Sequence, residues 1–222
     1  MIRPDSSAVG VAILARAPVP GHAKTRLIPA LGAEGAARLQ SWLIQHTVAK
    51  ALAAGVGPVS VWCTGDRHHP AFNFYDQEDR IHLRTQPEGD LGWRMLWAIR
   101  ESAGPGGVVV IGTDCPALTP THLRQAAERL QYCDSVIFPA EDGGYVLIGM
   151  RKPIRQSLEP VFEQIDWGSD RVMAQTRERL TMSGGTWDES TLLWDVDRPE
   201  DLPRLFALCP ELDHIAGFEA GS

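Results

Sequence analysis

The sequence predicts an α/β protein in which helices cover both faces of a mostly parallel sheet. Short apolar runs rich in β-branched residues recur along the chain, and Val108–Ile111 is apolar throughout, as in a strand buried on both faces. Segments with helical spacing of apolar residues or with helix-capping signals separate these runs. Strands that alternate with helices build three-layer α/β/α folds around a parallel sheet, so we expect that architecture here.

The first half of the chain is predicted to hold four strands and two helices. The expected strands are residues 9–15, 58–63, 81–85 and 108–111, and the expected helices are residues 33–54 and 93–102. Leu39, Leu43 and His46 share one face of the first helix, and Gly55 ends it. His68 and His69 lie in a polar loop, where adjacent histidines are usually solvated, so a metal site there is not favoured.

The second half continues the alternation. The expected strands are residues 134–138, 145–150 and 192–195, and the expected helices are residues 120–130, a segment capped by Ser169 that reaches Thr181, and a last helix that opens near Arg198. The sequence shows no internal repeat, low-complexity tract or linker. With 44% hydrophobic residues, the 222 residues suffice for one sizeable core, so we expect a single domain over residues 1–222.

Composition excludes several classes of function. The net charge of −7 argues against a general nucleic-acid binder, which needs a basic face, but leaves room for a small phosphorylated ligand. The four cysteines form no CxxC pair, so a zinc or disulfide framework is not expected and a reducing cytoplasm fits. No apolar stretch approaches the length of a membrane span.

Asp114 is the first candidate for a functional residue. It follows the central strand within Gly112–Pro116, at the carboxyl end of a strand, where open α/β sheets bind their ligands. A carboxylate without a nearby cation in sequence is interpreted as a metal ligand. The alternative is a helix cap, but Thr119 before Pro120 suits that role better.

The loop after the first strand is a candidate anion site. Arg16, Lys24 and Arg26 lie together there in an otherwise acidic protein, in the connection that holds phosphates in mononucleotide-binding sheets. A P-loop is a poor match, because Ala23 and Val19 stand where the motif needs glycines. The alternative is a solvated basic loop.

Two further segments carry carboxylates. In Glu141–Tyr145, Gly143 and Gly144 would let a backbone approach a ligand and leave Asp142 free to bind hydroxyls, although Asp-Gly is also a hairpin signal. In the segment 194–201, we expect only one of Asp195 and Asp197 to face a site. Glu200 and Asp201 fall in the first turn of a helix, where the dipole favours them without any function.

Together these segments carry a family resemblance over nearly the whole chain. The matching pieces are Ala15–Leu27, Gln86–Gly92 with Arg94 and Met95, Gly112–Pro116, Glu141–Tyr145 and Asp195–Leu202. The chain resembles the nucleotide-diphospho-sugar transferase superfamily with its GT-A fold and, more closely, the bacterial DUF2064 proteins, described as glycosyltransferase-like. Its first piece is also similar to the phosphate loop of a guanylyltransferase. It departs from the common nucleotidyltransferase start, because Pro-Val-Pro-Gly replaces the usual glycine-rich pattern.

The resemblance implies a role for each matching position. Asp114 and Asp197 would bind Mg²⁺ or Mn²⁺. Lys24 and Arg26, with Arg16, would hold the phosphates of a nucleotide. Gly21, Gly143 and Gly144 would be further positions for binding the nucleotide. Lys24, Arg26, Asp114 and Asp142 would form the catalytic set, with Asp142 binding or activating an acceptor hydroxyl.

The implied activity is metal-dependent transfer from a nucleoside triphosphate or a nucleotide sugar to a small-molecule acceptor. Nucleotidyl transfer to a phosphorylated acceptor is favoured by the guanylyltransferase-like loop, and glycosyl transfer from a nucleotide sugar is the alternative. A non-catalytic nucleotide-binding protein is the third possibility. Most of the tryptophans are expected in the core, and Trp167 is the candidate platform for a base or sugar.

Overall fold

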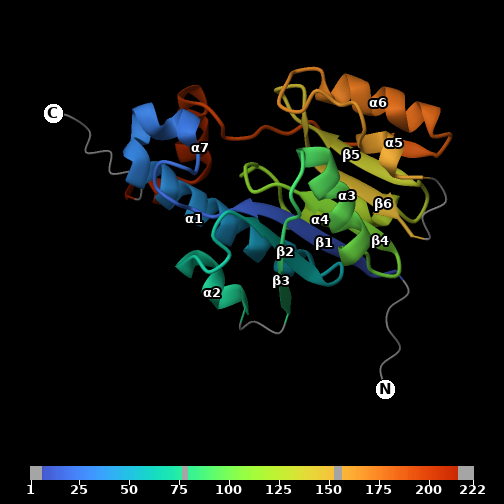
Figure 1. Ribbon diagram of the computed structural model, residues 1–222, viewed down its shortest axis with the longest axis horizontal. Helices are drawn as coiled ribbons and strands as arrows, with labels where there is room; N and C mark the ends of the chain where they lie inside the picture. The colour runs from blue at the N-terminus through green and yellow to red at the C-terminus, as the bar shows by residue number, and fades with distance from the viewer. Residues whose placement is uncertain (1–6, 77–79, 153–156, 215–222) are drawn as a thin grey trace.

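The computed structural model describes residues 7–76, 80–152 and 157–214, and a seven-stranded sheet forms its centre (Figure 1). The strands are β1 (Val9–Arg16), β2 (Val59–Thr64), β3 (Ile81–Thr85), β4 (Gly107–Ile111), β5 (Ser135–Pro139), β6 (Tyr145–Arg151) and β7 (Trp187–Glu189). Their order across the sheet is β3-β2-β1-β4-β6-β5-β7. The β1, β2, β3 and β4 strands run parallel, β6 is antiparallel to both of its neighbours, and β7 is parallel to β5. The predicted mostly parallel sheet is confirmed.

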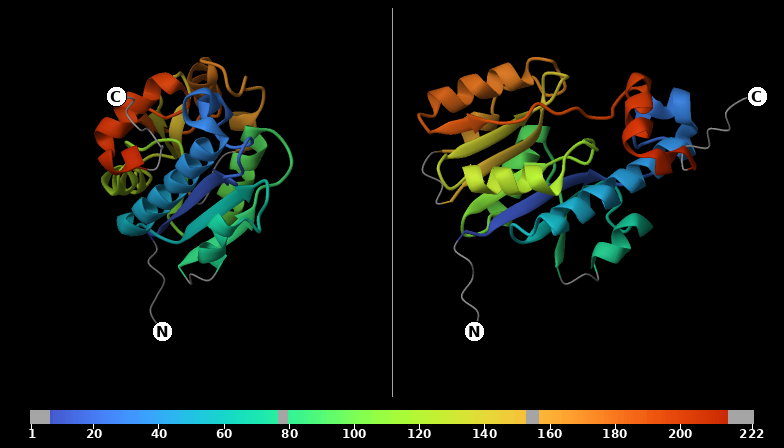
Figure 2. Two further views of the ribbon diagram at one scale, coloured as in Figure 1. Left: turned by 90° about the vertical axis from the view of Figure 1, so that its left-hand side faces the viewer. Right: turned by 180° about the vertical axis from the view of Figure 1, so that it is seen from behind.

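Helices cover both faces of this sheet. They are α1 (Ile28–Ala54), α2 (Pro70–Asp76), α3 (Leu91–Ser102), α4 (Pro120–Arg129), α5 (Glu159–Phe162), α6 (Val172–Met182) and α7 (Leu202–Leu208). Apolar residues of α1, α2 and α4 pack with one set of strand side chains, and those of α3, α5 and α6 pack with the other set. The two clusters make the three-layer α/β/α architecture that the sequence predicts, and Figure 2 shows its layers from two further directions.

Local sequence explains where the main helices begin and end. Asp90 caps α3, since its carboxylate accepts a hydrogen bond from Trp93 N at 2.8 Å. Thr119 caps α4 in the predicted way, with Pro120 at the first helical position. The α1 helix starts five residues earlier than predicted and contains a break at Gly32, whose φ of 69° only glycine adopts easily.

A third apolar cluster lies at one end of the molecule, away from the sheet. It joins α7 to the first part of α1 and to the short 3₁₀ helix η1 (Thr25–Leu27), and an extended stretch near residue 195 links it to the sheet (Figures 1 and 2). Trp194 and Val196 of this stretch are buried in the cluster. The third cluster therefore supports the basic loop and the C-terminal carboxylate segment together.

Several predicted elements are wrong. The last strand is β7 and not residues 192–195, where Leu193 forms only an isolated bridge to Ala140. The α6 helix begins at Val172, so Ser169 does not cap it; the Ser169 hydroxyl instead accepts a bond from Arg171 N at 3.2 Å. The short helices α2 and α5 are additional. His69 directly precedes α2, and its Nδ1 accepts a hydrogen bond from Ala71 N in the first turn of that helix.

Two further features accord with the composition. All four cysteines are unpaired. Across the described ranges, none of the helices combines the length and the apolar composition that crossing a bilayer requires.

Candidate active site

A cavity of about 600 Å³ opens at the carboxyl ends of β1 and β4. The β1 end, the basic loop, the segment after β4, the β5–β6 turn and the stretch near residue 195 all contribute to its lining. Its volume lies in the range of small-molecule sites. It occupies the edge at which parallel α/β sheets bind ligands.

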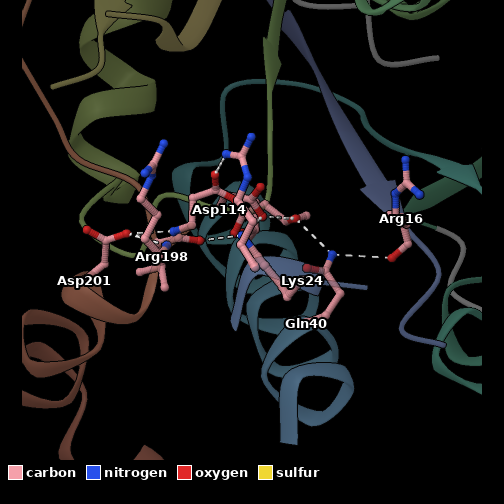
Figure 3. Close-up of polar contacts among 11 residues, drawn as sticks. Arg16, Lys24, Gln40, Asp114, Arg198 and Asp201 are labelled. Carbon is pink, nitrogen blue, oxygen red and sulfur yellow. Dashed lines mark hydrogen bonds and ion pairs between the residues drawn. The ribbon is translucent and has the colours of Figure 1, made fainter. Parts of the chain in front are cut away.

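Lys24 brings the basic loop into this cavity. The backbone carbonyl of Val19 accepts bonds from His22 N and Ala23 N, which folds the loop into a turn, and Lys24 then takes a left-handed conformation with φ 47°. Only 4% of the Lys24 side chain is exposed. Its Nζ lies 2.9 Å from Asp114 Oδ1 and donates a hydrogen bond to the Val196 carbonyl (Figure 3). A left-handed non-glycine residue is strained, and such strain concentrates at functional sites.

A buried polar chain positions Asp114 from behind. The Thr113 hydroxyl donates to Asp114 Oδ1 at 3.0 Å and accepts from Gln40 Nε2 at 3.2 Å. Gln40 is 3% exposed, and its Nε2 also donates a hydrogen bond to the Arg16 carbonyl at 3.4 Å. Gln40 and Thr113 are residues that the sequence analysis missed. A glutamine on the inner face of α1 was the available signal for this chain.

Arg26 and Asp197 form a second ion pair, and both residues line the same cavity as the first pair. The Arg26 side chain is 59% exposed and that of Asp197 is 40% exposed. Asp201 holds the segment that carries Asp197, because its Oδ2 accepts from Asp197 N at 2.9 Å and from Arg198 N at 2.7 Å. The structure thus places each of the two predicted metal-binding carboxylates against one of the predicted phosphate-binding cations.

Asp195 also lines the cavity, so the expectation that only one of Asp195 and Asp197 faces the site is wrong. Side chains two residues apart in an extended segment point to the same face, while Trp194 and Val196 point into the third cluster. Burial, followed by the negative charges of Asp142 and Asp114, raises the pKa of Asp195 to about 6. The spacing itself was the signal that sequence reasoning missed.

The predicted glycine positions separate into two kinds. Asp142 and Gly144 line the cavity, and Asp142 Oδ1 accepts from Gly144 N at 2.8 Å, which closes the β5–β6 turn. Gly143 and Gly21 are not among the lining residues. Gly143 has φ +90°, and a Cβ there would lie 2.2 Å from the Asp170 carbonyl oxygen, so close packing explains that glycine.

The remaining predicted residues lie farther along the cavity wall. Arg16 lines the cavity, and its guanidinium extends away from the Lys24–Asp114 pair (Figure 3). Trp167 lines the wall as well and meets Tyr145 edge to face, with ring centroids 6.4 Å apart. Gln86 and Arg94 are lining residues to which the sequence analysis assigned no role.

The carboxylates suit a hard divalent cation. The side chains of Asp114, Asp195 and Asp197 offer only oxygen donors. Burial, and after it the charges of Asp142 and Asp114, raises the pKa of Asp195, and a bound cation would compensate that negative charge. Within the residues that the structure describes, no three acidic, histidine or cysteine side chains converge on one point. Mg²⁺ typically takes one or two carboxylates and completes its shell with substrate phosphates and waters. The donor set fits that pattern.

Comparison with known proteins shows a family match in the sequence and similar solved structures. The profile of a bacterial family described as "Uncharacterized protein conserved in bacteria (DUF2064)" matches residues 47–169. A protein of Desulfovibrio desulfuricans G20 with the provisional name nucleotide-diphospho-sugar transferase is 26% identical, with a TM-score of 0.78 over 96% of this chain and 97% of that one. None of the curated proteins matches the sequence.

Two more distant structures share the fold. CMP:2-keto-3-deoxy-manno-octonic acid synthetase, complexed with CTP, is 14% identical with a TM-score of 0.58 over 92% of this chain and 99% of that one. Rv0371c of Mycobacterium tuberculosis H37Rv, in complex with manganese, is 16% identical with a TM-score of 0.51 over 90% and 99%. These proteins therefore share the fold of this chain around the cavity.

Proposed function

This chain belongs to the bacterial DUF2064 family, and from its site we propose that it is a metal-dependent transferase that uses a nucleotide-activated donor. The reaction that we favour is nucleotidyl transfer from a nucleoside triphosphate to a small phosphorylated acceptor. One observation carries the proposal. Two cations and their carboxylate partners, Lys24 with Asp114 and Arg26 with Asp197, meet at one end of a ligand-sized cavity.

The cations are assigned to the phosphates. Lys24 has a buried stem and an ammonium group held at a fixed point, so it can act as a preorganised charge against a phosphate oxygen. Arg26 is more exposed and can present its planar fork to a second phosphate. A basic loop after the first strand of a parallel sheet is also where mononucleotide folds hold phosphates.

The carboxylates are assigned to a divalent ion. Asp114 and Asp197 would hold Mg²⁺ or Mn²⁺, with Asp195 as a further carboxylate lining the same cavity, and the manganese complex of Rv0371c agrees with that choice. When bound, the ion neutralises charge on the phosphates as the bond to the leaving group lengthens. Lys24 would then bind phosphate in place of its present carboxylate partner. Arg26 would hold the departing pyrophosphate while an acceptor phosphate oxygen attacks the α-phosphorus.

Glycosyl transfer from a nucleotide sugar is the second candidate, and the position of Asp142 favours it. One Asp142 oxygen is committed to Gly144 N, while the residue still lines the cavity, so its other oxygen can meet an acceptor hydroxyl. In that reaction the cations would stabilise a nucleoside diphosphate leaving group. Asp142 would then accept the proton of the attacking hydroxyl.

A thermal-shift screen tests the proposal. Nucleoside triphosphates and nucleotide sugars are compared with and without Mg²⁺, for the native protein, for Asp114→Asn and for the surface control Asp188→Asn. A ligand at about 100 times its dissociation constant stabilises by roughly 2.7 kcal/mol, which moves the melt of a chain this long by about 5–10 °C. We expect a metal-dependent shift with a triphosphate that is lost only in Asp114→Asn.

The other outcomes discriminate between the candidates. A shift with nucleotide sugars alone would favour glycosyl transfer. A shift of the same size with and without Mg²⁺ would indicate a non-catalytic nucleotide-binding protein. No shift with any of these compounds would contradict the proposal.

A further inference from the structure

Arg94 lines the cavity, and its side chain has no partner among the residues that the structure describes. It lies in the first turn of α3. Its Nε is buried and forms no hydrogen bond, and within the described ranges its side chain makes no ion pair. By contrast, Arg100 on the same helix pairs with Glu159. A buried N–H that lacks an acceptor is unfavourable, so the free guanidinium points to a ligand that supplies acceptors.

Neighbouring contacts hold the start of α3, and with it Arg94, in place. The Asp90 cap fixes the first turn of the helix. Gly92 lies directly under Trp167, since a Cβ at Gly92 would come within 2.7 Å of the Trp167 ring. Met95 Sδ accepts a weak bond from the Tyr145 hydroxyl at 3.7 Å. The guanidinium is therefore carried on a rigid element, as a selective binding site requires.

Gln86 offers the complementary group, a fixed acceptor. Its Nε2 donates to the carbonyl of Trp62 at 2.7 Å and to that of Ala15 at 3.2 Å, so both amide hydrogens are used at the ends of β2 and β1. Gln86 N also donates to the Cys63 carbonyl at 2.9 Å. Within the described part of the chain, the side-chain oxygen of Gln86 accepts no hydrogen bond, and the residue lines the cavity.

Charge is divided between the two parts of the cavity wall. All four lining carboxylates follow β4 in the sequence: Asp114, Asp142, Asp195 and Asp197. The wall built by the ends of β1, β2 and β3 and by α3 has no carboxylate, and its polar side chains include Arg16, Gln86 and Arg94. The proposed function assigns the metal and the phosphates to the wall that carries the carboxylates. The wall built by the ends of β1, β2 and β3 and by α3 is then left for the base of the nucleotide.

We propose that Arg94 and Gln86 read the base of the nucleotide and select guanine or cytosine; this rests on the function proposed above. A guanidinium fork donates two hydrogen bonds to two adjacent acceptors, which guanine presents as O6 and N7 and cytosine as O2 and N3. Both bases also carry N–H groups that Gln86 Oε1 can accept. Adenine has an amino group beside its ring nitrogens, and uracil has an N–H between its carbonyls, so neither offers such an adjacent pair.

Calorimetric titration with Mg²⁺ present tests this inference. The probes are GTP, CTP, ATP, UTP and inorganic tripolyphosphate, which fills the phosphate end and has no base. The variants are Arg94→Met, Arg94→Lys, which keeps the charge without the fork, and the matched control Arg100→Met on the exposed side of α3. We expect GTP or CTP to bind about tenfold or more tightly than ATP and UTP, as a good bidentate base contact allows.

The variants should separate the contribution of the base to the binding affinity from that of the phosphates. Arg94→Met should weaken binding of the preferred nucleotide by about tenfold and abolish the preference between bases. Its affinity for tripolyphosphate should stay within about twofold of that of the native protein. Arg94→Lys should also lose the preference, and Arg100→Met should keep it. If Arg94→Met fails to fold, Arg94→Lys carries the test.

Three results would overturn the inference and leave the proposed function standing: equal affinity for the four nucleotides, an equal loss for tripolyphosphate in Arg94→Met, or no effect of either Arg94 variant. Absence of binding by every nucleotide and by tripolyphosphate would contradict the proposed function itself, and the inference with it.

Discussion

Lys24 combines a constrained backbone with a buried charge. Its left-handed φ of 47° and the burial of its side chain are both unfavourable for an isolated lysine. The Asp114 carboxylate and the Val196 carbonyl compensate by accepting hydrogen bonds from its ammonium group. The loop thus holds one positive charge at a fixed point beside the carboxylates.

Replacing Lys24 by Met should weaken triphosphate binding by about tenfold or more and slow turnover by roughly 100-fold, because a preorganised donor is lost. Titration calorimetry and a pyrophosphate-release assay would measure the two effects. Lys152→Met removes an exposed lysine at the end of β6, outside the cavity lining, and should change neither quantity. Native-like affinity and turnover in Lys24→Met would contradict the assignment.

At the residue scale, the sequence allowed prediction of single positions but not of their pairing. Asp114 was predictable because a carboxylate at the end of a buried strand has few structural uses. That Lys24 would pair with Asp114 was not predictable, since the two residues are joined only through the fold. The Gln40–Thr113 chain was missed for the same reason. Asp195 could have been included, because its spacing from Asp197 places both on one face.

The β5–β6 turn shows how an element depends on its neighbour. Gly143 has a positive φ, and its carbonyl accepts a bond from Met173 N at 2.7 Å in the first turn of α6. The backbone of Asp170 lies directly against the position that a Cβ would occupy at Gly143. The turn and α6 are therefore held backbone to backbone, which fixes Asp142 at the cavity.

Gly143→Ala should lower the free energy of unfolding by roughly 3 kcal/mol or more, because it adds a clash to an unfavourable φ. Gly184 is the matched control. Its φ is +71°, but no atom lies within 4 Å of its Cβ position, so Gly184→Ala should cost only about 1 kcal/mol of backbone strain. Urea denaturation would compare the two variants. Equal losses would show that the contact with Asp170 is unimportant.

At the element scale, the predicted bounds agree best with the structure for strands that are buried along their whole length. The strands at the centre of the sheet are buried on both faces, so their apolar runs identify them almost to the residue. The α2 and α5 helices are too short for a clear helical period. The segment 192–195 has a strand-like pattern, but Leu192 is exposed and Trp194 packs into the third cluster, so only Leu193 bridges to the sheet.

The whole molecule is one sheet with a parallel part and an antiparallel part. Asp134 ties the latter together: its carboxylate accepts from Thr186 N at 2.9 Å, just before β7, and from Arg151 at 2.5 Å, at the end of β6. Fold class was predictable from the alternation of elements, which limits the possible architectures. The strand order and the antiparallel β6 were not, because they depend on contacts between distant segments.

The stability of the molecule should depend on pH through Asp134. The Thr186 backbone N–H, followed by the Thr186 hydroxyl and Arg151, lowers the pKa of this carboxyl to about 2 from an ordinary 3.8. A lowered folded-state pKa stabilises the fold above the ordinary pKa, and this contribution is lost as the pH falls from about 4 to 2. Asp134→Asn should therefore cost about 2 kcal/mol at pH 7 and almost nothing near pH 2.

Urea denaturation at a series of pH values would measure this difference. Asp188→Asn, which breaks a partly exposed ion pair between β7 and Arg129 at the end of α4, is the control and should show little dependence on pH. A constant difference between the native protein and Asp134→Asn at all pH values would show that the carboxylate charge contributes nothing.

The alternation in the stretch from Trp194 to Asp197 links the core to the chemistry. Trp194 and Val196 are anchored in apolar packing, and Asp195 and Asp197 consequently have little freedom to turn from the cavity. Conformational entropy that a ligand would otherwise remove from these carboxylates has already been lost in folding. A cavity-forming substitution such as Val196→Ala would return conformational freedom to these carboxylates. A purely hydrophobic residue therefore determines how far the site is preorganised for its ligand.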